Sequence, residues 1–467
     1  MSTQTPKSEN ISVSINSAAQ TSPKDIPAAE QLPLDDVPVK RQFFRSTLFQ
    51  LLVVSLCAFT SPGIWSAMNG LGVGGSESPD LVNAANAILY AIMTVTCFAG
   101  PFVTNLLGFR WTLSLGSVGY PLYAAGLYVN NRSGTTWFVY FGAAACGLSA
   151  GLFWSVEGAI ATGYPEAYKR GRYLATWFSF RNMGNVIGGA VSLALNHNAN
   201  QKGEVGYQLY LAFIAIQCLG FLIGLLLSNP EKVQRDDGTK INAPRGTDWR
   251  TERKAMWHLA RSRSILLLAP LFWYFGWMQA YPGTYLETYF TVRARSLGSF
   301  LSAIVMTLST WLAGTLVDLR WHKNRKVRAV ATYTLIAAIN SATWIWAVYI
   351  QDEYRKTDPT LDWGSPAFGR GFGLYMLQSV SLATVENYIY WCISNLSDSP
   401  GGQIRYSSLL RGIETAGVAV SFGVQAVPTA LIVTAGLNLG FWCVALPFSY
   451  YATLQVVRKF RKLDVFG

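Results

Sequence analysis

The sequence predicts an all-α membrane protein with about twelve transmembrane helices, arranged as two pseudo-symmetric six-helix bundles. Three observations predict it: long apolar stretches, a low charge content, and a polar segment that divides the stretches six and six. Of the 467 residues, 51% are hydrophobic and only 13% are charged, whereas soluble globular domains carry about 25% charged residues. Many stretches here reach the roughly 20 mostly apolar residues that a helix needs to cross the hydrocarbon core.

The apolar windows give twelve expected spans, whose ends are set only to within several residues. The first six are 46–70, 82–107, 111–129, 136–162, 172–195 and 207–228. The last six are 264–289, 297–317, 328–350, 368–391, 406–433 and 435–457. The expected organisation is a tail (1–42), a first bundle (43–228), a cytoplasmic linker (229–263), a second bundle (264–457) and a C-terminal segment (458–467).

Basic residues predict which way the chain crosses the membrane. Of the 37 lysines and arginines, 28 fall on the side of the tail, the linker and the C-terminus, and 6 fall on the other side. Cytoplasmic loops are enriched in these residues, so both termini are expected in the cytoplasm. The tail is rich in Ser, Pro, Gln and Asn, and a segment of this composition is predicted to be disordered. Plasma membrane and vacuole both fit this orientation.

Several classes of function are disfavoured. The net charge of +12 comes from loops between spans, so no nucleic-acid partner is expected. The 6 cysteines and 3 histidines show no metal-ligand spacing, and neither a metal nor a cofactor is expected. No P-loop, nucleophile elbow or dinucleotide-binding glycine motif is present. An enzyme or an ATP-driven pump is therefore disfavoured.

Two short segments allow alternative interpretations. Residues 251–263 mix basic with apolar side chains, as in a helix lying on the anionic inner leaflet; a solvated basic linker explains them equally well. Asn131-Arg132-Ser133 is an N-glycosylation sequon on the non-cytoplasmic side. Asn131 is therefore a candidate glycosylation site, although its loop is only a few residues long.

Ionisable residues recur at matching places in the two halves. Glu157 and Arg181 occupy the fourth and fifth spans, and Glu386 and Arg411 occupy the tenth and eleventh. In each hairpin the acid and the base lie at similar depth, so contact between them is sterically reasonable. Glu414 follows Arg411 by three residues and therefore shares its helix face. This matching predicts that the halves are a parallel repeat.

Such charges are costly inside a membrane, at roughly 2.5–3.5 kcal/mol each near a helix centre. The functional interpretation is a polar cavity in which Glu157 or Glu386 exchanges a proton and Arg181 or Arg411 holds an anionic group. The structural interpretation is a set of ion pairs that lock helices together and meet no ligand. Trp154 and Trp177 lie near these charges, where they either line the same cavity or pack in the core.

The two halves also share a turn after their second span. Gly314-Thr315-Leu316-Val317-Asp318 ends the eighth span, and a basic turn follows it. The corresponding end of the second span holds Asn105, Gly108 and Arg110. With twelve spans in two parallel halves and a long central linker, this pattern resembles the major facilitator superfamily.

Further motifs narrow the resemblance. They are Gly151-Leu152-Phe153-Trp154-Ser155-Val156-Glu157-Gly158, Gly163-Tyr164-Pro165-Glu166, Arg170-Gly171-Arg172-Tyr173, Arg181-Asn182-Met183-Gly184-Asn185 and the segment from Arg405 to Glu414. Over residues 43–457 the chain is similar to the fungal form of the uncoordinated-ninety-three-like branch of that superfamily. The resemblance implies alternating access and assigns gating to Asn105, Gly108, Arg110, Gly314 and Asp318. At Asn105 and Phe109 the chain departs from the usual acidic and basic residues of the turn.

Two functions follow from these observations. The first is a secondary transporter that moves a small solute by alternating access, with a proton as the expected coupling ion. The alternative is a non-transporting accessory or regulatory protein that binds a channel or receptor in the bilayer, since the resemblance extends to branch members of that kind. The expected partners are the lipid bilayer with either a small solute or another membrane protein.

Overall fold

The computed structural model describes residues 42–72, 74, 79–166, 170–238, 241, 249–318, 324–396 and 400–466. The expected tail lies outside the described residues, apart from Gln42. Helices make up almost all of the described chain, in two sets joined by a linker. The first set comprises α1 (Thr47–Ala58), α2 (Ile64–Asn69), α3 (Pro79–Ser133), α4 (Trp137–Gly163), α5 (Arg170–Asn196) and α6 (Tyr207–Gly224). We call it the N-half.

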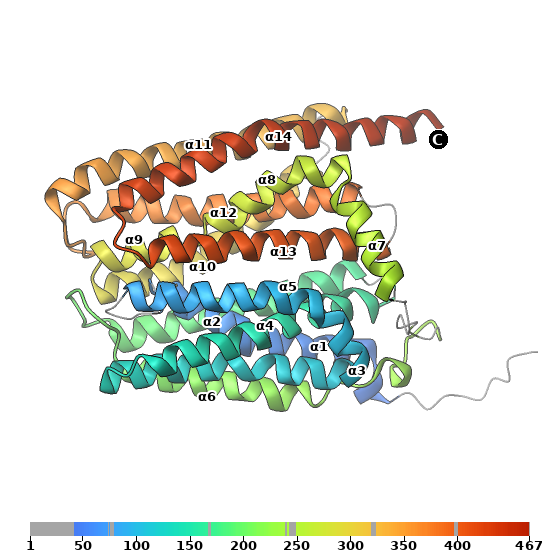
Figure 1. Cartoon of the computed structure of the whole chain (residues 1–467), viewed down its shortest axis with the longest axis horizontal. Coiled ribbons are helices and arrows are strands. Elements are labelled where there is room, and N and C mark those ends of the chain that lie inside the picture. Colours follow the sequence, from blue (N-terminus) through green and yellow to red (C-terminus); the bar gives the residue numbers. More distant parts are fainter. Residues whose placement is uncertain are drawn as a thin grey trace, which may run out of the picture. The chain divides into compact units, whose positions relative to one another are not determined.

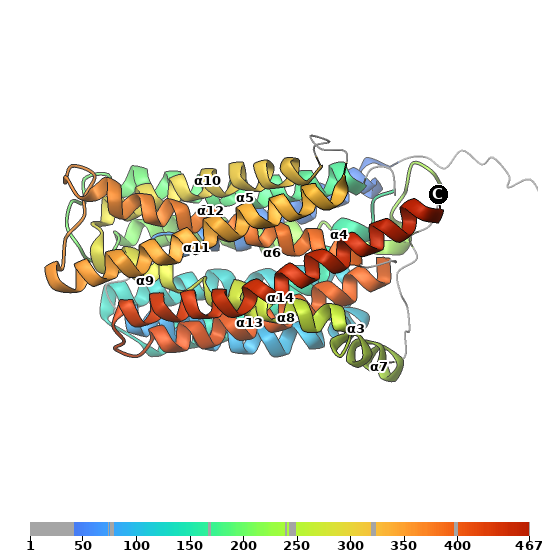
Figure 2. The same cartoon turned by 90° about the horizontal axis from the view of Figure 1, so that it is seen from above.

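The second set, the C-half, has the same number of membrane-crossing segments. It comprises α8 (Arg263–Trp277), α9 (Tyr281–Tyr289), α10 (Val292–Asp318), α11 (Arg325–Thr357), α12 (Phe368–Leu396), α13 (Pro400–Gln425) and α14 (Leu431–Phe466). Helix α7 (Trp249–Ala260) belongs to the linker. Figures 1 and 2 show the long helices side by side along one axis, with the connections gathered at two ends. We call the end that holds α7 the linker end, and the opposite one the far end.

Five of the helices depart from one helix per crossing; two of them, α8 and α9, form one crossing with a break between them. Helix α3 contains two crossings, because Gly108 interrupts its helical backbone with φ 80° and ψ 163°. Helices α1 and α2 form a single crossing through a short π-helix that contains Pro62, whose missing N–H removes one helical hydrogen bond. Counted this way, the described residues form twelve crossings, as the sequence predicts.

Length and apolarity alone identify seven of these crossings among the described residues. Helices α5, α12 and α13 are not among the seven. They carry charged residues in their interiors: Arg181 in α5, Glu386 in α12, and Arg411 and Glu414 in α13. A helix with charges in its interior must bury them against protein or a cavity. These three helices are therefore the ones expected to face inward.

Each half has an apolar core of its own. One buried cluster runs from Ile265 to Ala452, entirely within the C-half. Two others hold the N-half together, one around Met68 and Tyr123 and one around Leu51 and Phe153. The halves meet mainly where α3 packs against α13 and where α5 packs against α10. The apolar packing within each half is therefore more extensive than the packing between the halves.

The far end is closed by hydrogen bonds between the halves. Ser299 Oγ donates to the carbonyl oxygen of Ala67 over 2.8 Å. The backbone N–H groups of Val292 and Arg293 donate to the carbonyls of Gln201 and Ala199, each over 2.9 Å. Because backbone groups of one half satisfy those of the other, this end forms a seal in the described conformation.

A loop of the C-half supports this seal. Asp362 accepts hydrogen bonds from Thr291 Oγ1 and Arg293 Nε, each over 2.7 Å, and forms an ion pair with Arg293. The Arg293 guanidinium holds the pKa of the Asp362 carboxyl at about 2, below its usual range. Asp362 therefore stays ionised at neutral pH and keeps residues 291–293 in position.

Arg295 buries a charge next to this seal. The sequence places Arg295 in a loop, but it lies in α10 and is fully buried. Its three side-chain nitrogens have no hydrogen-bond partner within the described chain. A buried guanidinium without hydrogen bonds is costly, and the nearby Glu287 carboxylate compensates part of this cost through its charge.

A break in the seventh crossing brings backbone to the middle of the molecule. Helix α8 ends at Trp277, and α9 begins at Tyr281 with Pro282 in its first turn. The intervening residues 278–280 form a turn in which Met278 and Ala280 keep helical dihedrals, and a membrane protein tolerates such an interruption only where it lines a cavity or is covered by protein. The sequence predicts this crossing as one continuous span (264–289), so the break is a feature that apolarity does not reveal.

Helix α8 approaches α13 very closely at Gly276. A β-carbon added to Gly276 would lie 2.1 Å from the carbonyl oxygen of Glu414. The absence of a side chain at Gly276 therefore lets α8 bring Gln279 within 3.2 Å of the Glu414 carboxylate. This crossing places two side chains of the cavity described below.

We predict that Gly276→Ala lowers the free energy of unfolding by about 1–3 kcal/mol, because the added methyl group forces α8 and α13 apart. The thermal unfolding midpoint in detergent measures the effect. Gly423→Ala, also on α13, is the matched control, since nothing lies within 4 Å of the added β-carbon there. An equal response of the two variants would contradict the close crossing.

Candidate functional site

A central cavity lies between the two halves and has two lobes. One lobe has a volume of about 200 Å³ and the other about 190 Å³. Both are lined by Trp65, Tyr90, Asn185, Gln279 and Met306 among others, so they are adjacent parts of one space. We call them the amide lobe, nearer the far end, and the charged lobe, nearer the linker end.

The charged lobe is lined by four ionisable side chains from three helices. Arg181 comes from α5, Glu386 from α12, and Arg411 and Glu414 from α13. Arg181 and Glu386 form an ion pair across the two halves, with 3.8 Å between Nη2 and Oε1. Their side chains are 18% and 22% exposed, so both reach the cavity. At this length the contact is an ion pair without a hydrogen bond.

Trp154 lies between the two arginines. The guanidinium carbon of Arg411 is 4.7 Å from its ring centroid, and that of Arg181 is 5.6 Å away. Both distances are within the range of cation–π attraction. Trp154 therefore contacts a cation of the N-half and a cation of the C-half. It also lines the charged lobe, which is the first of the two placements considered from the sequence, a cavity wall or the core.

Arg411 is held more tightly than Arg181. Its Nη1 donates to both carboxylate oxygens of Glu414, over 3.1 and 2.9 Å, and its Nη2 donates to the Tyr390 hydroxyl over 2.8 Å. Gln279 Nε2 donates to the same Glu414 carboxylate. Arg411 and Glu414 meet because they lie three residues apart on one helix face. Gln279, from the break between α8 and α9, adds a further hydrogen bond to Glu414.

The charged side chains therefore do not form the acid–base contacts expected within each hairpin. Arg181 pairs with Glu386 instead of Glu157, and Arg411 pairs with Glu414 instead of Glu386. The reason is the extra acid on α13: Glu414 occupies Arg411 and leaves Glu386 free to face α5. Matching positions in a repeat do not fix which charges meet.

Glu157 has a separate environment. It is fully buried, and its Oε1 accepts a hydrogen bond from Trp177 Nε1 over 2.5 Å. Its Oε2 has no hydrogen-bond partner within the described chain. Neither Glu157 nor Trp177 lines the cavity lobes, so Trp177 packs in the core beside this acid.

The residues expected to act in gating lie at the linker end. Gly108 forms the kink of α3, where its positive φ requires glycine, and Arg110 is exposed just after it. Asn105 belongs to α3, and Gly314 and Asp318 belong to α10. The side chains of Asn105 and Asp318 lie outside the described part of the chain. The gating role of all five residues stays a prediction.

Asn131 lies in the last turn of α3, and its Nδ2 donates to the carbonyl oxygen of Val205 over 3.2 Å. This nitrogen is the atom to which a glycan would be attached. Glycosylation of Asn131 therefore requires this hydrogen bond to break.

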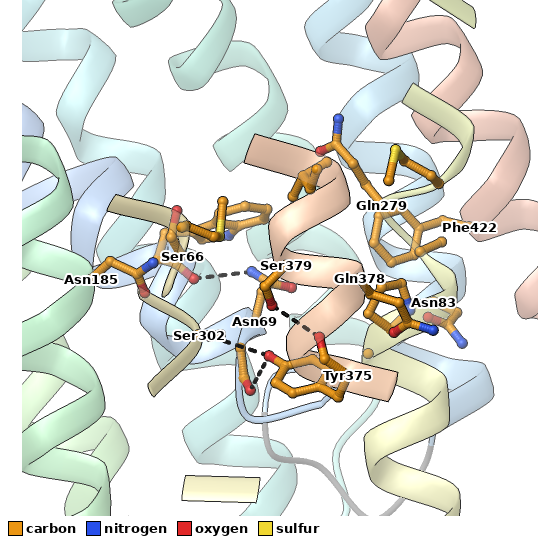
Figure 3. Close-up of a pocket in the computed structure, with 18 of the residues that line it drawn as sticks. Ser66, Asn69, Asn83, Asn185, Gln279, Ser302, Tyr375, Gln378, Ser379 and Phe422 are labelled. Atoms are coloured by element: carbon orange, nitrogen blue, oxygen red, sulfur yellow. Dashed lines mark hydrogen bonds between the residues drawn. The ribbon is translucent and has the colours of Figure 1, made fainter. Parts of the chain in front are cut away.

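The sequence analysis missed the amide side chains of the cavity. Asn69, Asn83, Asn185, Gln279 and Gln378 all line the amide lobe (Figure 3). Each interrupts an apolar stretch without adding charge, so a search for ionisable residues does not find them. Uncharged amides inside predicted spans are the signal that would have identified this lobe. Among the described residues, no group of three or more potential metal ligands is present.

Comparison with known families places this architecture. Residues 83–351 match the model of a family described as the ion channel regulatory protein UNC-93. The chain is 38% identical to the notoamide biosynthesis cluster protein O′ of Aspergillus versicolor, over 90% of this chain and 91% of that protein. It is 30% identical to a UNC93-like protein of Schizosaccharomyces pombe, over 81% of this chain and 76% of the relative.

The fold is also similar to that of a solved transporter. A POT family transporter in complex with 5-aminolevulinic acid superposes with a TM-score of 0.62, over 86% of this chain and 96% of that one. The sequences are only 12% identical, so the similarity concerns the fold alone.

We predict that Arg411→Gln lowers the free energy of unfolding by about 3–5 kcal/mol, because the buried Glu414 carboxylate loses its cation. The double variant Arg411→Gln/Glu414→Gln should recover most of this loss, since no charge is then left unpaired. Chemical or thermal unfolding in detergent measures both.

Arg370→Gln is the control for the Arg411 series. Arg370 pairs with Glu353 at 2.8 Å, but these side chains are 40% and 45% exposed, and exposed pairs contribute about 0–1 kcal/mol. If Arg411→Gln were no more destabilising than Arg370→Gln, the Arg411–Glu414 pair would not be the buried contact described here.

Proposed function

Because this chain belongs to the UNC-93 family and encloses a cavity between two six-crossing halves, we propose that it is a secondary transporter. It moves a small solute by alternating access and couples this movement to a proton. The single observation that carries the proposal is the charged lobe, in which ionisable side chains of both halves line one space. A protein that only locked its helices together would place these charges in dry pairs without a cavity.

The distribution of contacts supports movement of the halves about this cavity. Hydrogen bonds between the halves seal the far end, whereas the ion pair between Arg181 and Glu386 lies deeper, at the cavity wall. In the proposed cycle the far-end seal opens when the linker end closes. The buried Arg295, whose guanidinium has no hydrogen-bond partner within the described chain, adds a cost to the far-end seal.

Glu386 is the leading proton site of the proposed mechanism. It lines the cavity and meets Arg181 only at 3.8 Å. Protonation of its carboxylate would remove the attraction and release Arg181, loosening one contact between the halves. Arg181 and Arg411 serve as counter-charges. Glu157 is a second candidate, with an unpartnered oxygen, but it can take part only if the cavity reaches it in another conformation.

The orientation is part of the proposal. The excess of lysine and arginine at the linker end supports cytoplasmic placement of both termini. The far end would then face the outside or the lumen of a vacuole; both membranes fit. No chemical conversion of the solute is proposed.

The alternative function is regulation of another membrane protein. It is favoured by the description of the matching family as an ion channel regulatory protein. A regulator of this kind would co-purify with a channel in stoichiometric amounts in mild detergent and would move no solute by itself.

Reconstitution in proteoliposomes with an inside-to-outside pH gradient tests the proposal. A panel of neutral, cationic and anionic radiolabelled solutes should contain at least one whose uptake depends on the gradient. Glu386→Gln should lose gradient-driven uptake at least tenfold but retain exchange of labelled for unlabelled solute, since a glutamine imitates the protonated acid permanently.

Glu231→Gln, an exposed acid of the linker, is the control and should behave like the unaltered protein. Absence of flux for every solute, together with a co-purifying channel, would reject transport in favour of regulation. Gradient-driven uptake that survives Glu386→Gln but not Glu157→Gln would move the proton site to α4.

A further inference from the structure

The amide lobe has the composition of a binding site for an uncharged ligand. Among the described residues, those that line it include no Asp, Glu, Lys, Arg or His. An ion that entered it would lose hydration without meeting an opposite charge, which is strongly unfavourable. The adjoining charged lobe offers little help, because two arginines and two glutamates there already face one another.

Several polar groups of this lobe have no hydrogen-bond partner. Gln378 is 2% exposed, and neither its Oε1 nor its Nε2 has a partner within the described chain. Asn83 is fully buried; its Nδ2 donates to Thr284 and Gln425, but its Oδ1 has no partner. A buried polar group left unpaired is unfavourable, so a ligand that pairs with it is bound more tightly.

The unpartnered groups are of both kinds. The unpartnered acceptors are Asn83 Oδ1, Asn185 Oδ1 and Gln378 Oε1, and the unpartnered donors are Trp65 Nε1 and Gln378 Nε2; all five atoms are buried in the described conformation. A hydroxyl group both donates and accepts, so a ligand with several hydroxyls matches this mixture. A carboxylate or an ammonium group would satisfy only one of the two kinds.

Aromatic rings and an interrupted crossing complete the lobe. Trp65, Tyr90, Trp344, Tyr375 and Phe422 contribute ring surfaces, and Tyr90 and Phe422 stack across the two halves with centroids 5.8 Å apart. The break between α8 and α9 brings Met278, Gln279 and Ala280 to the wall. Broken crossings at the middle of a membrane protein are frequent places of solute binding.

We propose that the amide lobe is the substrate subsite and that it binds an uncharged small molecule rich in hydroxyl groups, of the polyol or monosaccharide class. Gln378 and Asn83 hold its hydroxyls, and the rings of Trp65 and Phe422 cover its apolar faces. The proposal deepens the transport function and rests on it for the fate of the ligand. Binding itself does not require transport.

Equilibrium binding to the purified full chain in detergent tests the subsite. The probes are myo-inositol and three compounds that share one skeleton: D-glucose, D-glucosamine as the cation and D-glucuronate as the anion. Quenching of tryptophan fluorescence and a rise in thermal midpoint report binding. We expect at least one neutral probe to bind, and at least tenfold more tightly than the charged probes.

Gln378→Leu should weaken this binding at least tenfold, and Asn185→Leu should weaken it as well. Gln217→Leu is the matched control: Gln217 is also fully buried with both amide atoms unpartnered, but it lies in α6 and does not line the lobe. It should leave the affinity unchanged. The thermal midpoint of each variant without ligand checks that it is folded.

Failure of all four probes to bind, tighter binding of a charged probe, or an equal effect of Gln378→Leu and Gln217→Leu would overturn the subsite. The outcome is separable from that of the transport proposal. Binding of a neutral probe without any flux would reject transport and keep the subsite, whereas flux of a charged solute without neutral binding would do the reverse.

Discussion

The contact between Arg181 and Glu386 is the interaction on which the arrangement of this protein depends. Each side chain is charged and belongs to a helix that must lie inside a membrane, where an isolated charge is costly. Among the described residues, Glu157 of the N-half lies beside Trp177 and lines neither lobe, and Arg411, the other basic residue of the cavity, is taken by Glu414. The N-half and the C-half therefore compensate each other, and the cavity forms where they do so.

Small residues make this compensation possible. A β-carbon on Gly63 of the first crossing would lie 2.8 Å from the carbonyl of Arg181, and one on Gly184 would lie 2.5 Å from the carbonyl of Phe59. This close approach brings α5, and with it Arg181, toward the centre of the molecule. Gly276 does the same for α8 against α13. Backbone packing thus decides which charged side chains reach the cavity.

The two halves carry acids at matching positions but place them differently. The acids of α4 and α12 occupy matching positions, yet Glu157 is buried beside Trp177 while Glu386 faces the cavity. One additional acid, Glu414, explains the difference, because it removes Arg411 from the set of free partners. A single substitution in one copy of a repeat can therefore assign different roles to equivalent residues.

The sequence predicts the helices far better than it predicts the site. Apolar length identifies the crossings, and the charges within α5, α12 and α13 identify the helices that face inward. The sequence does not predict the pairing of Arg181 with Glu386, because that contact depends on how the two halves pack against each other. Nor does it reveal the break after Trp277 or the amide lobe, since Gln378 and Asn83 change neither the charge nor the length of their spans.

Charge reversal at the contact between the halves tests this account most directly. Arg181→Glu and Glu386→Arg would each place two like charges together, and each should lower the free energy of unfolding in detergent. The double variant restores an opposite pair, so it should be more stable than the sum of the single effects predicts, by a coupling energy of about 1–3 kcal/mol. If the losses of the two single variants simply add in the double variant, the two side chains do not compensate each other and the central claim is wrong.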